Sequence, residues 1–341
     1  MRLNSITLRN YKKFTEEKNI DFSSNINLII GNNGSGKSSI LQAIAAVIGN
    51  ATQELEKPSK LNWSGFNYEL LQSGGLPPML KMQVEFSEKE ITKTQQYFDE
   101  IQQQGRNIHT RPGNQKSIYI DLDFDKDKVV CRKQNDFFQF RGYIYAKQLV
   151  ASNPYKSLFA DVGNIYWYTE ERNSRSFRNV KSTENLEDIR DFLVSRYRFH
   201  QRVKYGEIEL ENDQRDIYQD IVDLYQTIFP DRKLVGSAPR RNPLDAYKPD
   251  FFYFSDGTHQ YEISEMSAGE RSIFPMIIDF ANWKINNSII LIDEIELHLH
   301  PPLQQALISA LPKLGKNNQF IITTHSDYVA YMVDDTNKIY L

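Results

Sequence analysis

The sequence lacks the features of a secreted, membrane-spanning or disulfide-stabilised protein. Cys131 is the single cysteine among 341 residues, so no intramolecular disulfide can form, which fits a reducing compartment. No apolar run approaches the roughly 18 residues that span a bilayer, and the opening residues MRLNSITLRNYKKF contain no apolar segment of a signal peptide. We therefore expect a cytoplasmic protein with no membrane partner.

Further absences narrow the class of protein. The chain has no internal repeat, no low-complexity tract and no heptad run of coiled-coil length. Its formal net charge of −3 excludes a uniformly basic surface for nucleic acid, although a local basic patch remains compatible with it. With 40% hydrophobic and 25% charged residues, the composition is that of a globular protein with a sizeable core.

The order of the expected strands and helices indicates an α/β fold. The runs INLII, SIILIDE and QFIITTH predict short buried strands, because each contains several consecutive apolar residues. Helical spacing in SSILQAIAAVIG predicts a helix directly after the first run, and Gly49 is expected to end it. Two more helices are expected near 184–203 and 212–229, followed by a β-hairpin around Asp256.

The segment GNNGSGKSS carries the strongest chemical signal. It fits the pattern G-x-x-x-x-G-K-[ST] between an expected strand and an expected helix. A phosphate chain needs a concave row of backbone N–H groups free of side chains, and the following helix directs its positive end to the same place. We expect Lys37 to reach the β- and γ-phosphates and the Ser38 hydroxyl to bind Mg²⁺. The predicted nucleotide-binding residues are Gly31, Asn32, Asn33, Gly34, Ser35, Gly36, Lys37, Ser38 and Ser39.

Two later strands end in side chains that suit ATP hydrolysis. Asp293 and Glu294 follow four apolar residues, at the edge where an α/β sheet binds its ligands. We expect Asp293 to hold Mg²⁺, directly or through water, and Glu294 to orient and polarise the attacking water. His325 ends the next strand and is expected to donate a hydrogen bond to the γ-phosphate. The predicted catalytic residues are therefore Lys37, Glu294 and His325, with ATP and Mg²⁺ as ligands.

A second anion-binding turn, in ISEMSAGERS, lies far along the chain from the first. A Ser-Ala-Gly-Glu turn that opens a helix presents backbone N–H groups and the positive end of the helix to an anion. Ser267 and Glu270 also fit the S-x-x-E capping box, which satisfies the polar groups of a helix end. The two interpretations are compatible with each other.

Together these motifs resemble the ABC-type ATPase heads of the RecF/SMC/OLD group. The series runs from ITLRNYKKF through GNNGSGKSS, MSAGERS and LIDEIELHLHP to TTHS, and DEIELHLHP is especially similar to AAA-type ATPases of bacterial anti-phage systems. The resemblance implies an α/β P-loop NTPase, an ABC-ATPase-like head with a compact α+β insertion lobe. Within this single head, 1–341, it implies an N-terminal part of the nucleotide-binding lobe at 1–50, an insertion and helical lobe at 51–255, and a signature, Walker B and switch-histidine part at 256–341.

The resemblance also implies an assembly. In such a head, MSAGE corresponds to the signature motif, which completes the ATP site of a second copy arranged head to tail. Ser267 and the N–H of Gly269 would then bind the partner's γ-phosphate, and two ATP molecules would be buried in a symmetric homodimer. Hydrolysis would release this clamp.

Two smaller features leave alternatives open. The turn LRNYKKF is expected to contact nucleotide through Asn10, Tyr11, Lys12 and Phe14, or else to be an edge strand with a solvated turn. The basic stretch 172–204 interleaves aromatic residues with arginines, which suits a nucleic-acid backbone with base stacking. It equally suits an amphipathic helix with a solvated basic face.

These observations support three functional hypotheses. The first is a homodimeric ATPase that regulates a separate effector, a nuclease or toxin, in anti-phage defence; the OLD-type resemblance implies a nuclease domain, but only a short tail follows His325. The alternative is a RecF-like DNA-binding ATPase of repair or recombination. The third is an ATP-gated scaffold with little turnover.

Overall fold

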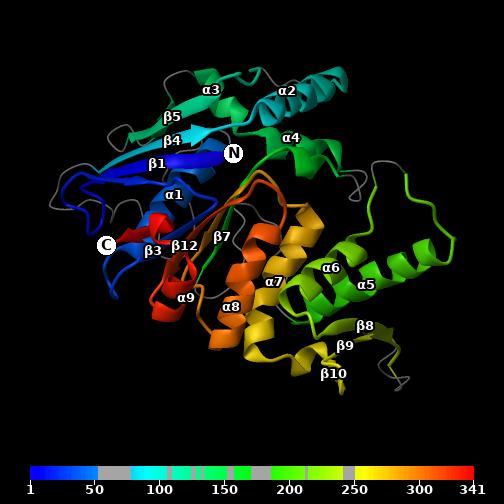
Figure 1. The fold of residues 1–341 in the computed structure, drawn as a ribbon. Coiled ribbons are helices and arrows are strands. Elements are labelled where there is room, and N and C mark those ends of the chain that lie inside the picture. Colours follow the sequence, from blue (N-terminus) through cyan, green and yellow to red (C-terminus); the bar gives the residue numbers. More distant parts are fainter. Residues whose placement is uncertain are drawn as a thin grey trace.

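A five-stranded parallel sheet forms the centre of the molecule (Figure 1). The computed structural model describes residues 1–52, 78–105, 110–123, 128–131, 134–151, 157–169, 186–211, 214–240 and 250–341. The strand order is β13–β3–β12–β11–β7, and each neighbouring pair runs parallel. The strands are β3 (Ile26–Ile30), β7 (Ile165–Tyr168), β11 (Ile289–Ile292), β12 (Gln319–Thr324) and β13 (Lys338–Tyr340). The α/β P-loop class expected from the sequence is confirmed.

Successive residues of these strands enter two different hydrophobic cores. Ile289 and Leu291 of β11 belong to one core, whereas Ile290 and Ile292 belong to the other, because side chains alternate across a strand. Helix α1 (Lys37–Thr52) fills the first core, and α6 (Ile217–Ile228), α7 (Ala268–Trp283) and α8 (Pro301–Ala310) fill the second. Consequently α1 and α7 lie on opposite faces of the central sheet.

An antiparallel sheet covers the other side of α1. Its order is β2–β1–β4–β5–β6, with the strands β1 (Arg2–Arg9), β2 (Lys18–Asp21), β4 (Met79–Glu85), β5 (Ser117–Asp123) and β6 (Lys128–Cys131). Because α1 lies between two sheets, residues 43–48 are all fully buried. The expectation that Gly49 ends this helix is wrong, since α1 continues to Thr52. Packing on both sides overrides the weak helix propensity of glycine.

The remaining elements form helical and small-sheet parts beside the central sheet (Figure 1). The helices are α2 (Glu88–Gln103), α3 (Gln134–Gln139), α4 (Gly142–Leu149), α5 (Leu186–Lys204) and the short α9 (Asp327–Met332). A three-stranded sheet contains β8 (Lys233–Ala238), β9 (Phe251–Ser255) and β10 (Gln260–Glu262), and Ser255 pairs with Gln260 across the expected hairpin. No helix in the described ranges is long and apolar enough to cross a bilayer.

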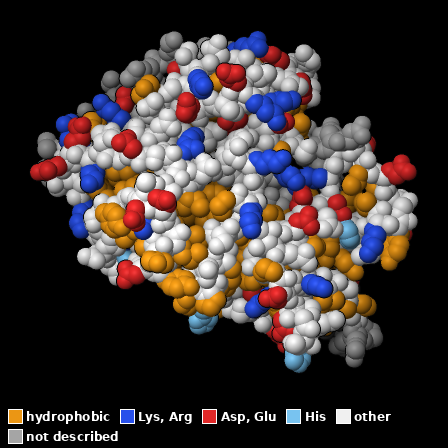
Figure 2. Space-filling model, viewed as in Figure 1, with side chains coloured by type: hydrophobic (Ala, Val, Ile, Leu, Met, Phe, Trp, Pro, Cys, Tyr) orange, Lys and Arg blue, Asp and Glu red, His pale blue; other side chains and the backbone are white. Residues whose placement is uncertain are grey.

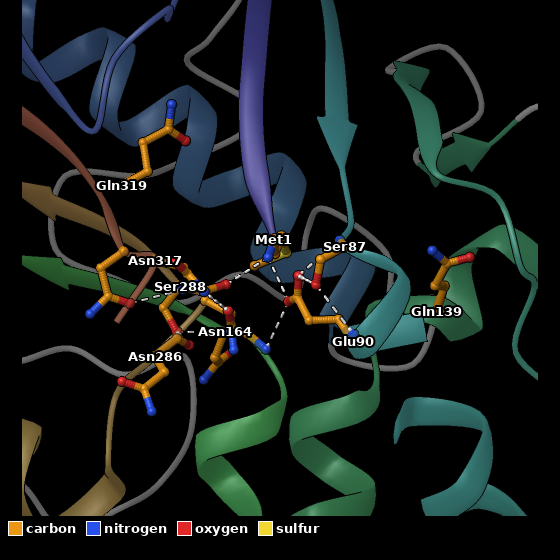
Figure 3. A network of polar contacts seen from close by, with 12 residues as sticks. Met1, Ser87, Glu90, Gln139, Asn164, Asn286, Ser288, Asn317 and Gln319 are labelled. Carbon is orange, nitrogen blue, oxygen red and sulfur yellow. Dashed lines mark hydrogen bonds and ion pairs between the residues drawn. The ribbon is translucent and has the colours of Figure 1, made fainter. Parts of the chain in front are cut away.

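Polar contacts join the two sheets at the amino ends of the parallel strands. The Met1 amine donates to Glu90 Oε1 of α2 at 2.5 Å and to the carbonyl of Asn287 at 2.7 Å (Figure 3). The amide side chain of Gln319, at the start of β12, bonds both backbone groups of Leu3 in β1, at 2.8 and 2.9 Å. These contacts fix one end of the sheet, and the chemistry-bearing side chains follow the opposite, carboxyl ends of its strands.

Candidate nucleotide-hydrolysis site

The loop between β3 and α1 has the backbone that the sequence pattern predicts. Gly34 and Gly36 have left-handed φ values of +74° and +106°, which residues with a Cβ rarely adopt. A Cβ at Gly36 would also lie 3.0 Å from the ring of Phe14. Helix α1 begins directly afterwards at Lys37, so the positive end of the helix faces this loop. A narrow loop of this kind fits the phosphate chain of a nucleotide.

The Lys37 ammonium uses all three of its N–H groups within the site. It donates to the carbonyl oxygens of Gly31 at 2.8 Å and Asn32 at 3.1 Å, and to Nδ1 of His325 at 3.2 Å. Burial lowers the pKa of Lys37, and three nearby carboxylates oppose that effect. The structure thus brings the P-loop lysine and the histidine after β12 into direct contact, although 288 positions separate them in sequence.

His325 also contacts Glu294, and the two bonds fix its tautomer. Because an ammonium only donates, Nδ1 of His325 must accept from Lys37. The proton of the neutral ring then resides on Nε2, which donates to Glu294 Oε1 at 3.2 Å. Glu294 sits at a left-handed φ of +46° immediately after β11. Both side chains remain about 30% exposed, so this pair is open to a ligand from solution.

Ser38 and Asp293 provide neighbouring oxygen atoms beside the lysine. The Ser38 hydroxyl donates to Asp293 Oδ1 at 3.1 Å, and the Thr323 hydroxyl donates to the same oxygen at 2.5 Å. Burial raises the pKa of Asp293, while the two hydroxyl groups counteract it. In the described ranges no group of three or more His, Cys, Asp or Glu side chains could hold a metal. Mg²⁺ nevertheless fits here, because it takes one or two protein oxygens together with phosphate oxygens and water.

The turn after β1 lies against the P-loop. Lys13 Nζ donates to the carbonyl of Gly34 at 2.6 Å, and the Phe14 ring lies beside Gly36. Lys12 bonds the Gln42 side chain of α1 instead, and Tyr11 is fully buried. Sequence reasoning proposed Asn10, Tyr11, Lys12 and Phe14 for nucleotide contact and missed Lys13. The only signal was the adjacent pair of lysines, which does not reveal which one faces the loop.

Ser267 forms the capping box that the sequence predicts at the start of α7. Its hydroxyl accepts from the Glu270 N–H at 3.2 Å, and Glu270 Oε2 accepts from the Ser267 N–H at 3.0 Å. A Cβ at Gly269 would lie 2.7 Å from the Leu303 side chain, so this glycine lets α7 approach the start of α8. In the described part of the chain, no hydrogen bond joins Ser267 or Gly269 to the P-loop. The structure therefore does not bring the second anion-binding turn to the first within one copy.

Glu270 is the centre of a buried polar cluster beneath that turn. Its Oε1 accepts from the hydroxyls of Tyr225 at 3.0 Å and Tyr261 at 2.5 Å, and it forms an ion pair with Arg232. Burial alone would raise the pKa of Glu270, but hydrogen bonds from Arg232, Tyr261 and Ser267 outweigh it and hold the pKa at about 2. Sequence reasoning found Glu270 only as a capping residue, because nothing local indicates its distant partners.

Three of the four arginines that the structure describes in the basic stretch are paired with acidic side chains. Arg190 and Glu262 form a buried ion pair at 2.7 Å. Two exposed pairs are Arg198 with Asp250 at 2.7 Å, and Arg202 with Glu207 at 3.3 Å. The first part of the stretch, 172–185, lies outside the described residues. In the described part, these pairs leave less positive charge for a phosphate backbone than the sequence suggests.

Comparison with known proteins places this geometry among ATPases. The AAA ATPase domain family matches residues 1–330. "Retron Vc95 probable ATPase" of Vibrio cholerae is 24% identical and covers 96% of this chain and 71% of the relative. "Retron Ec83 probable ATPase" of Escherichia coli is 25% identical, with 99% and 71% covered. "Septu protein PtuA" of Bacillus mycoides is 24% identical over 95% of this chain and 38% of that protein.

Solved structures agree on the fold. The Smc head bound to the C-terminal winged-helix domain of ScpA aligns with a TM-score of 0.56 at 16% identity, covering 98% of this chain and 93% of that chain. At this identity the similarity concerns the fold alone. The resemblance to ATPase heads of the SMC group, drawn from sequence motifs, is confirmed.

Proposed function

This chain is an ATPase that belongs to the AAA ATPase domain family, and from that premise we propose that it dimerises head to tail around Mg-ATP and regulates a separate effector in bacterial anti-phage defence. The observation that carries the proposal is the convergence of Lys37, Asp293 and His325 at the carboxyl ends of parallel strands. This is the edge where α/β sheets bind their ligands.

Each side chain of this site has a role that its position supports. Backbone N–H groups of 31–39 and the Lys37 ammonium would bind the phosphates, and the Ser38 and Asp293 oxygens would hold Mg²⁺. A Mg²⁺ ion held there would neutralise charge on the phosphate oxygens. Glu294 orients the water that attacks the γ-phosphorus and takes its proton, while His325 donates from Nε2 toward the developing charge. When ATP binds, we expect the Lys37 ammonium to exchange its bonds to carbonyl oxygens of its own loop for bonds to phosphate oxygens.

Dimerisation is supported by where the second turn lies. The helices α1 and α7 start from opposite faces of the sheet, so the turn at Ser267 is available to another molecule rather than to its own P-loop. On α9, directly after His325, Tyr328 is 45% exposed and Tyr331 is 90% exposed. Figure 2 shows hydrophobic side chains gathered over α8 and α9. An apolar surface beside the catalytic edge suits a protein contact.

The setting in defence rests on the relatives. Two carry retron ATPase names and a third carries a Septu name, and two of the three are covered over most of their length. We infer a comparable setting, in the cytoplasm, with a nuclease or toxin as the effector. The RecF-like alternative has less support, because three arginines in the described part of that stretch, Arg190, Arg198 and Arg202, pair with acidic side chains. Salt-sensitive, ATP-dependent DNA binding that is lost when Arg196 and Arg202 are reversed in charge would revive it.

Sedimentation velocity tests the proposed dimer. The variant Glu294→Gln is expected to bind ATP without rapid hydrolysis, because the amide cannot take a proton from water. With saturating ATP and Mg²⁺ it should sediment as a dimer, and without nucleotide it should sediment as a smaller species. A variant that also carries Lys37→Ala is the control, and its sedimentation should be the same with and without ATP. A strictly monomeric Glu294→Gln protein in saturating Mg-ATP would refute the proposal.

A further inference from the structure

We propose that Glu296 is a positioning residue that fixes the backbone of His325 beside the Glu294 carboxylate. The residue lies two positions beyond Glu294, in the turn that leaves β11, and sequence reasoning gave it no role. The inference rests on the proposed function of Glu294 and His325. It adds a residue whose contribution passes through the histidine rather than through the ligand.

The turn after β11 is tied to the end of β12 by a series of short bonds. The Thr323 hydroxyl donates to Asp293 and accepts from the N–H of Glu294 at 2.8 Å. The Thr323 carbonyl accepts from the N–H of Ile295 at 3.1 Å. Thr323 is fully buried. These bonds fix where the backbone of the turn runs, but none of them reaches His325.

Glu296 supplies the missing connection. Its Oε1 accepts from the backbone N–H of His325 at 2.6 Å, and its Oε2 accepts from the hydroxyl of Thr324 at 2.7 Å. The Thr324 hydroxyl in turn accepts from the N–H of Ser326 at 3.0 Å. One carboxylate therefore fastens three consecutive residues at the point where β12 ends. Hydrogen bonds to a charged acceptor are about twice as strong as neutral ones.

The arrangement favours positioning over direct chemistry. Both oxygens of Glu296 already accept a hydrogen bond within the protein, whereas Glu294 offers its carboxylate to the exposed ring of His325. The N–H of His325 lies just past the β12 ladder, so without Glu296 it loses the partner that holds it. Small displacements of a catalytic group cost large factors in rate. Loss of Glu296 should thus slow turnover without removing any group that binds ATP.

A double-mutant cycle in steady-state ATP hydrolysis tests the proposal. We expect Glu296→Ala to lower kcat about 10-fold while KM for ATP changes less than about 2-fold. In the His325→Ala background, the same substitution should have almost no further effect on kcat, because its route of action is already gone. Glu296→Gln keeps one acceptor and should lie between wild type and Glu296→Ala. Glu209→Gln, at an exposed position, is the matched control and should behave as wild type.

A second, more conservative variant keeps the proposal testable if Glu296→Ala does not fold. Thr324→Val removes the hydroxyl's bonds to Glu296 and to the Ser326 N–H but keeps the shape of the side chain and the bond from Glu296 to His325, so it should lower kcat about 2-fold to 3-fold at unchanged KM. Independent, multiplicative losses from Glu296→Ala and His325→Ala would overturn the positioning role and leave the proposed function intact. Full activity of His325→Ala would instead contradict the role proposed for the histidine, and this inference with it.

Discussion

Two regions of this molecule differ in how their polar groups are held: the P-loop side, around 31–39, and the signature side, around the turn at Ser267. Around the P-loop, Lys37, Ser38, Asp293 and His325 come from three distant segments and bond one another at the open end of the sheet. At the signature turn, the hydrogen bonds of Ser267 within the described residues stay inside its own helix start, with Glu270 and Arg271. The side chains that support Glu270 come from α6, from the residue before β8 and from β10.

The difference shows which contacts a ligand can exchange. On the P-loop side, lysine, hydroxyl and carboxylate groups bond one another, and we expect ATP and Mg²⁺ to replace some of these bonds. On the signature side, Glu270 is almost fully buried and accepts its hydrogen bonds inside the protein. Ser267, in contrast, is exposed. We therefore expect substitutions on the first side to change chemistry, and substitutions on the second to change stability and assembly.

The largest effect should follow from Glu294→Gln on the P-loop side. We expect kcat for ATP hydrolysis to fall about 100-fold, because the amide cannot serve as a general base. The apparent affinity for ATP should stay close to that of wild type, since the residues proposed to bind phosphate are untouched. Phosphate release at saturating ATP measures the first quantity, and nucleotide titration the second. Equal rates of hydrolysis in the two proteins would show that Glu294 is not the base.

A smaller effect, and one on stability, should follow from Glu270→Gln on the signature side. The pKa of Glu270 is held at about 2, below its ordinary 4.5, so the ionised group stabilises the fold above pH 4.5 and loses that contribution as pH falls toward 2. At pH 7 the free energy of unfolding of the variant should be about 2 kcal/mol lower than that of wild type. Urea denaturation at pH 7, 4.5 and 3 should show that the difference in free energy of unfolding between wild type and variant becomes smaller as the pH falls. A gap that is independent of pH would contradict the ionised state of this carboxylate.

The smallest effect is expected from removing the capping serine in either of two capping boxes of the same type. Ser267 with Glu270 caps α7, and Ser87 with Glu90 caps α2. Replacing either serine by alanine should cost about 1 kcal/mol of stability, because one helix end loses its cap. Only Ser267→Ala should also weaken ATP-driven dimerisation. If both variants dimerise alike, the signature turn has no role beyond capping.

The two sides also differ in how far the sequence predicts them. Lys37, Asp293 and His325 each follow a recognisable apolar strand, and because parallel strands align their carboxyl ends, their meeting at one edge could be anticipated. The partners of Glu270, namely Arg232, Tyr225 and Tyr261, could not, since they lie on separate elements whose packing leaves no local pattern. Glu296 was missed for the same reason. The expected division of the chain at 50 and 255 stays a prediction.

The central claim is that each copy holds half of two ATP sites, and mixing two defective variants tests it most directly. Lys37→Ala disables the P-loop side, whereas Ala268→Glu places a carboxylate on the exposed start of α7, where it would repel a partner's γ-phosphate without disturbing the core. Each variant alone should be nearly inactive. An equimolar mixture should recover about a quarter of wild-type ATP hydrolysis, because half of the dimers are mixed and each of these has one intact site. A mixture no more active than its separate components, or full activity of Ala268→Glu alone, would contradict the account.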